Sequence, residues 1–101
     1  MIELLKKVQE LTHYDYKTLT EKALKCSEEV GELAQAVLSY TNACGCGYKG
    51  LGVEEVLEES VDVIIVALSI ICSIDNGVDN FDAEFDRKME KWKAKIKERN
   101  Q

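Results

Sequence analysis

The stretch Val53–Ile74 reads VEEVLEESVDVIIVALSIICSI and decides the fold. Its apolar residues occupy most of a helical circumference, and one narrow stripe of carboxylates and serines runs along the remaining face. This pattern predicts a single long helix that is mostly buried. The uninterrupted apolar part, Val63–Ile74, is shorter than the roughly 20 residues that a membrane-spanning helix needs. We therefore expect a core helix and no membrane contact.

The segments on either side of this stretch also have helical spacing of their apolar residues, and the chain contains no proline. We predict further helices over 2–11, 18–41 and 80–99. The second begins with a capping box formed by Thr18 and Glu21, and Gly31 at its middle suggests the close approach of another backbone. The glycine-rich segment 42–52 is predicted to be the only long loop, and it lacks the pattern of a P-loop. Short connections favour an all-α, antiparallel four-helix bundle-like protomer.

Composition limits what such a chain can do. Its 101 residues suit one domain, 1–101, and leave so little surface to bury that a large cavity needs a second subunit. A net charge of −6 argues against binding to duplex nucleic acid. The N-terminus does not resemble a secretion signal, so we expect a cytoplasmic protein. Cys44 and Cys46 form a lone Cys-x-Cys pair, for which free thiols are the favoured interpretation over a zinc site.

Acidic residues recur at i, i+3 spacing on the two central helices, as Glu29 and Glu32 on one and Glu59 and Asp62 on the other. Antiparallel packing of these helices brings the four carboxylates together across the gap, while Glu28 points further out. Basic residues are scarce nearby, so the carboxylates require a divalent cation, and oxygen-only ligation favours Mg²⁺ or Mn²⁺. Glu29 also borders an apolar stripe of Cys26, Val30, Leu33 and Val37.

A solvated face is the alternative interpretation of a charge run, and we keep it for Glu54, Glu55 and Glu58. A second alternative, at the level of function, is a non-catalytic acidic helical module for interaction or regulation.

The pattern Glu28-Glu29-x-x-Glu32 followed by Glu59-x-x-Asp62, in a short all-helical chain, resembles the MazG-type branch of the all-α nucleoside triphosphate pyrophosphohydrolases. The resemblance covers about residues 10–92. It implies Mg²⁺-dependent hydrolysis of a nucleoside or deoxynucleoside triphosphate to the monophosphate and pyrophosphate, with Glu29, Glu32, Glu59 and Asp62 holding the metal and Glu28 assisting catalysis. It also implies a homodimer or homotetramer with the active site near the subunit interface. A phosphoribosyl-nucleotide pyrophosphatase ranks lower, because the first motif is more similar to MazG.

Substrate-binding candidates lie outside the acidic motifs. Segment 87–101 holds seven basic and two acidic side chains, and the resemblance implies that Lys88 contacts phosphate. The resemblance also points to His13 for base stacking, although a surface turn is the favoured interpretation of this residue. Lys25 and Trp92 complete the candidates. A stripe of Phe85, Met89, Trp92 and Ile96 reads as a packing surface that suits a subunit interface.

Overall fold

The computed structural model describes residues 2–100, without the side chains of Ile2, Cys44 and Cys46. Its elements are α1 (Ile2–Thr12), α2 (Leu19–Tyr40), the short 3₁₀ helix η1 (Ala43–Lys49), α3 (Val53–Ser73) and α4 (Gly77–Arg99). The described residues contain no strand, so the predicted all-α, bundle-like class is confirmed. The predicted free thiols of Cys44 and Cys46 lie outside the described side chains. No helix within residues 2–100 has the length and apolarity needed to cross a bilayer.

The start of α2 follows the prediction. The Thr18 side chain accepts a hydrogen bond from the Glu21 backbone N–H over 3.1 Å, and the Thr18 backbone N–H donates to the Glu21 carboxylate over 2.9 Å. This capping box satisfies two amide groups that the helix leaves unpaired. The expectation that another backbone approaches Gly31 closely was wrong for the single chain. Nothing lies within 4 Å of the position that a Cβ atom on Gly31 would occupy.

The glycine-rich segment 42–52 is less irregular than predicted, because η1 occupies most of it. Asn42 takes the left-handed conformation (φ 53°), which asparagine tolerates better than most residues. Its side-chain oxygen then accepts a hydrogen bond from the Gly47 backbone N–H over 2.9 Å. This side-chain acceptor holds the segment in a compact turn, which the count of glycines alone did not indicate.

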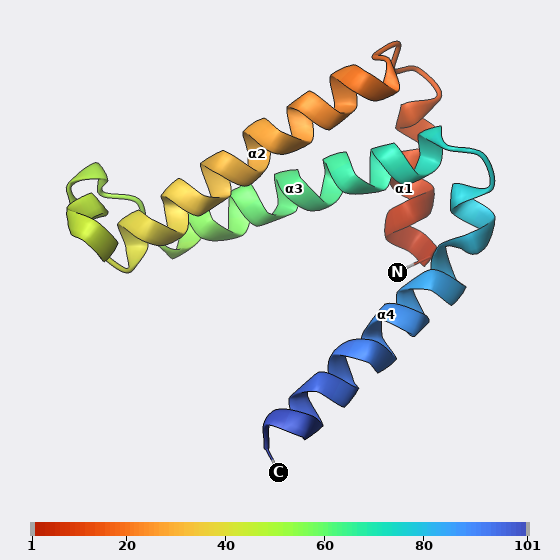
Figure 1. Cartoon of the computed structure of the whole chain (residues 1–101). Helices are drawn as coiled ribbons and strands as arrows, with labels where there is room; N and C mark the ends of the chain where they lie inside the picture. The colour runs from red at the N-terminus through yellow and green to blue at the C-terminus, as the bar shows by residue number, and fades with distance from the viewer. Residues whose placement is uncertain (1, 101) are drawn as a thin grey trace.

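The helices α2 and α3 run antiparallel and side by side, and α1 packs against α3 (Figure 1). After α3 the chain turns at Asn76, which is left-handed (φ 60°), and at Gly77. A Cβ at Gly77 would overlap the carbonyl oxygen of Ile71, so this close turn requires glycine. The helix α4 starts here, three residues earlier than predicted, and extends away from the other helices (Figure 1).

The prediction that 53–74 is mostly buried was wrong for one chain. Leu57, Ile64 and Ile65 of α3 are 66%, 49% and 47% exposed, and Leu68 is the buried member of the helix. The physical reason is the course of α4, which leaves α3 instead of folding back over it. An apolar face of α3 therefore lies open to solvent.

The buried face of α2 also differs from the predicted stripe. Val30 and Val37 are exposed, and the buried residues are Lys22, Glu29, Ala36 and Ser39. Three of these four side chains are polar, so α2 presents a polar seam to α3. The candidate sites described below lie along this seam.

Candidate metal centre

Three carboxylates from two helices meet on the seam between α2 and α3. Glu29 of α2 and Glu59 and Asp62 of α3 each offer an oxygen such that all three oxygens lie within 4.8 Å of one another. Glu29 is buried, at 5% exposure, and the other two are half-buried. The i, i+3 spacing places Glu59 and Asp62 one turn apart on the same side of α3, and the antiparallel partner supplies Glu29. The predicted convergence across the gap is therefore confirmed for these three residues.

Two oxygens in this cluster lack a partner. Glu29 Oε2 and Glu59 Oε2 are buried and accept no hydrogen bond from any described residue. The pKa of Glu59 is raised, mainly because burial removes water from its carboxylate and also because Glu32, Asp62 and Glu29 add negative charge. A buried, unpaired carboxylate oxygen is unfavourable unless a cation binds it. The donor set is made entirely of oxygen, and it fits Mg²⁺ or Mn²⁺.

The expectation that basic residues are scarce around the cluster was wrong. Lys25 Nζ lies 2.9 Å from Glu29 Oε1 and 3.8 Å from Glu28 Oε1. The hydrogen bond to Glu29 raises the pKa of Lys25 and keeps it charged. Lys25 thus satisfies one oxygen of Glu29 and leaves the other free. Lys25 lies four residues before Glu29 in a helix, and this i, i+4 spacing could have predicted the ion pair from the sequence.

The remaining predicted acids lie at the rim of the cluster. Glu32 is exposed, and its negative charge helps to raise the pKa of Glu59, but it is not among the three residues within 4.8 Å. Glu28 is exposed and contacts Lys25, in agreement with the expectation that it points further out.

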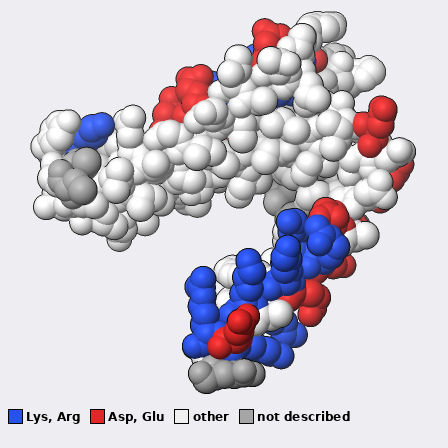
Figure 2. Space-filling view, in the orientation of Figure 1, with Lys and Arg blue, Asp and Glu red and all other residues white. Residues whose placement is uncertain are grey.

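Two of the substrate-binding candidates lie on α4, away from the acidic cluster. Lys88 lines a hollow with Ile71 and Ile74 at the corner between α3 and α4. Trp92 is 60% exposed and shares its hollow with residues of α4. Figure 2 shows that most of the lysines and arginines visible on this face lie over α4. One chain therefore does not bring Lys88 and Trp92 to the carboxylates.

His13 lies in the turn after α1. It is exposed, and its ring is edge-on to Tyr14 with 5.3 Å between the ring centroids. This placement agrees with the favoured interpretation of a surface residue. His13 also lines a polar hollow near the start of α2, which sequence reasoning did not anticipate.

No protein-family model matches this chain, and no curated protein or solved structure matches it either. The function that we assign below therefore rests on the residues and their geometry.

We expect that replacing Lys25 by methionine destabilises the metal-free protein, because Glu29 then keeps its buried charge without a partner. A bound Mg²⁺ would neutralise the same carboxylate, so we expect a larger Mg²⁺-induced rise in melting temperature in Lys25→Met than in the unmodified protein. Calorimetry in EDTA and in excess Mg²⁺ measures both effects, and Lys25→Arg, which keeps the charge, is the control. An equal loss of stability under both conditions contradicts this prediction.

Proposed function

We propose that this protein hydrolyses a nucleoside or deoxynucleoside triphosphate to the monophosphate and pyrophosphate in a reaction that depends on Mg²⁺, with Mn²⁺ as a possible substitute. The observation that supports the proposal most directly is the pair of unpartnered buried oxygens, Glu29 Oε2 and Glu59 Oε2, inside a three-carboxylate cluster. The spacing of these acids in the sequence, and the family it resembles, indicate the same chemistry.

The net reaction consumes one water and breaks the link between the α- and β-phosphates. Glu29, Glu59 and Asp62 would hold the metal ion, which would supply charge neutralisation for the triphosphate and polarise the phosphorus under attack. Glu32, exposed at the rim beside Glu59, would accept a proton from the attacking water. An acidic chain can bind an acidic substrate in this way because the cation lies between them.

A second copy of the chain is part of the proposal. The open apolar face of α3 and the stripe on α4 leave large apolar side chains exposed to solvent, and exposed apolar patches commonly mark protein–protein interfaces. The basic C-terminal half of α4, residues 87–99, in one copy also complements an acidic body, since residues 1–86 carry all of the net negative charge. We propose a homodimer, or a tetramer built from it, in which α4 brings phosphate-binding lysines such as Lys88 to a site that one chain leaves without them.

The test is a panel of canonical and modified triphosphates, ribo and deoxy, with a phosphoribosyl-nucleotide included. Pyrophosphate and inorganic phosphate are measured separately in Mg²⁺, in Mn²⁺ and in EDTA. We expect pyrophosphate release that requires the metal. Release of phosphate alone would indicate a different bond cleavage, and no release from any substrate would favour the non-catalytic interaction module.

A further inference from the structure

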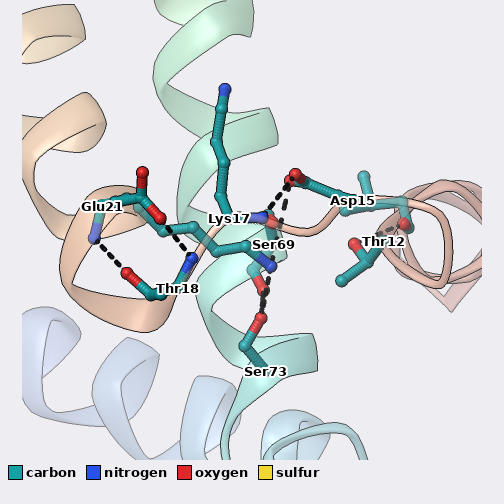
Figure 3. A network of polar contacts seen from close by, with 9 residues as sticks. Thr12, Asp15, Lys17, Thr18, Glu21, Ser69 and Ser73 are labelled. Atoms are coloured by element: carbon teal, nitrogen blue, oxygen red, sulfur yellow. Dashed lines mark hydrogen bonds and ion pairs between the residues drawn. The ribbon is translucent and has the colours of Figure 1, made fainter.

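The second polar feature of the α2–α3 seam is the buried side chain of Lys22. Its side chain is 6% exposed, and its ammonium group donates to Ser73 Oγ over 2.6 Å (Figure 3). Ser73 uses its own hydroxyl proton on the carbonyl oxygen of Ser69, over 2.8 Å, so it acts only as an acceptor toward Lys22. The contact anchors the start of α2 to the end of α3.

The charge of Lys22 is incompletely compensated. The nearest carboxylate oxygen, Asp15 Oδ2, lies 4.0 Å away, which is beyond hydrogen-bond distance. A lysine ammonium carries three donors, and among the described residues Ser73 takes one of them. A buried ammonium in this state favours an additional acceptor, because removing a charge from water without full pairing is costly.

A polar hollow of about 390 Å³ opens onto this ammonium group. Its lining includes the Lys22 ammonium and the carboxylate of Asp15; Lys17 also lines the hollow, but its side chain extends away from Lys22 (Figure 3). The amide of Gln9 and the ring of His13 add further donors. The full lining is Gln9, Thr12, His13, Asp15, Lys17, Lys22, Cys72 and Ser73. Several donors around one cavity suit a tetrahedral oxyanion, which offers several acceptor oxygens.

We propose that this hollow is a binding site for a phosphate group, with Lys22 as its main ligand. Asp15 is the one carboxylate in the lining, and it opposes the ligand. The site is distinct from the acidic cluster: Lys22 and Glu29 lie on the same face of α2, and seven residues of helix separate them by about 10 Å. It needs no metal ion, because the Lys22 ammonium supplies the positive charge.

Asp15 gives the proposal its sharpest test. The other oxygen of this side chain, Oδ1, accepts a hydrogen bond from the Lys17 backbone N–H over 3.1 Å. Asparagine keeps an oxygen for that bond and removes the charge. The Asp15→Asn variant therefore leaves the turn intact and removes the anion that competes with phosphate for Lys22.

The experiment is calorimetric titration of the full chain with inorganic phosphate in EDTA, which keeps the acidic cluster free of metal. We expect binding that weakens at least about tenfold in Lys22→Gln, because a charge-assisted hydrogen bond is lost. We expect it to strengthen at least about threefold in Asp15→Asn, where a negative charge is removed. Lys6→Gln, an exposed lysine on α1, is the matched control and leaves the affinity unchanged.

Two further arms separate this site from the proposed enzymatic activity. Binding of phosphate in EDTA should persist in Glu59→Gln, because that residue belongs to the other site. Titration with a nucleoside monophosphate shows whether the phosphate group is free or esterified: tighter binding than inorganic phosphate indicates a nucleotide, and weaker binding indicates the free ion. Failure of both ligands to bind, or equal binding by Lys22→Gln and the unmodified protein, overturns the proposal whatever the outcome of the activity assay.

Discussion

We expect glutamine in place of Glu59 to lower the proposed metal-dependent pyrophosphate release by about 100-fold or more and to stabilise the metal-free protein at neutral pH. The loss of activity follows from the removal of a charged oxygen that the proposed metal ion needs. Replacing a residue that only hydrogen-bonds to a metal ligand commonly lowers metal affinity or activity by about 10- to 100-fold. Replacing a ligand itself should therefore cost about 100-fold or more. The gain in stability follows from the crowding of Glu59 by Glu29, Glu32 and Asp62.

The pH dependence of this gain has a definite sign. The folded protein raises the pKa of Glu59 above its ordinary value of 4.5, so the folded state binds a proton here more tightly than the unfolded state. The stability that this proton contributes is present below pH 4.5 and is lost as the pH rises through the raised pKa. Glutamine does not titrate. The advantage of Glu59→Gln therefore appears as the pH rises from acidic to neutral and vanishes in acid.

Two measurements check the prediction, namely pyrophosphate release in Mg²⁺ and melting temperature in EDTA across the acidic to neutral range. The control is Glu58→Gln, the same change at an exposed position one residue away, and it alters neither quantity appreciably. Full activity in Glu59→Gln would remove the acidic cluster from the mechanism. A loss of stability in EDTA at neutral pH would show that Glu59 has a partner that compensates its charge.

Glutamate in place of Trp92 dissociates the proposed dimer. Trp92 lies at the centre of the α4 stripe, with Met89 and Ile96 one turn away on either side, at 43% and 41% exposure. Tryptophan is a common energetic anchor of interfaces, and its loss there typically costs about 2 kcal/mol or more, which the added charge increases. We expect the dimer dissociation constant to rise on the order of 100-fold.

Analytical ultracentrifugation over a range of concentrations measures this change. Lys91→Gln is the matched control: it also shifts the net charge by one negative unit, but Lys91 lies about 100° around the helix axis from Trp92, outside the apolar stripe, and its replacement leaves the dimer intact. We also expect the helical content of Trp92→Glu to fall, since an exposed helix with few contacts is marginal in water. A monomeric unmodified protein, or a dimer that Trp92→Glu does not weaken, contradicts the prediction.

The local features of this fold could be predicted from the sequence, because they depend on residues close together in the chain. The capping box at Thr18 and Glu21 follows from spacing alone, and so does the meeting of Glu59 and Asp62 on one side of α3. The pairing of Lys25 with Glu29 was equally visible in the i, i+4 spacing but was overlooked.

The burial of each helix face could not be predicted in the same way. Val30 and Leu57 have the periodicity of core residues, yet both are exposed; for Leu57 of α3 the reason is the course of α4 after Asn76. Lys22 shows the converse. Lysine side chains are almost always exposed, so the residue type argued against the burial of Lys22. Its position one turn before Cys26, however, places Lys22 on the face of α2 that packs against α3, and there it is buried.

The turn at Asn76 and Gly77 sets the direction of α4 relative to α3. A helix of 23 residues is about 35 Å long, so a rotation of about 10° at this turn moves its far end by about 6 Å. Small changes in two backbone torsion angles therefore translate into large displacements of the lysines that α4 carries. The backbone conformation of Asn76 and Gly77 therefore determines where the basic side chains of α4 lie. Substitutions at these two residues would alter the geometry of an assembled protein without changing any interface residue.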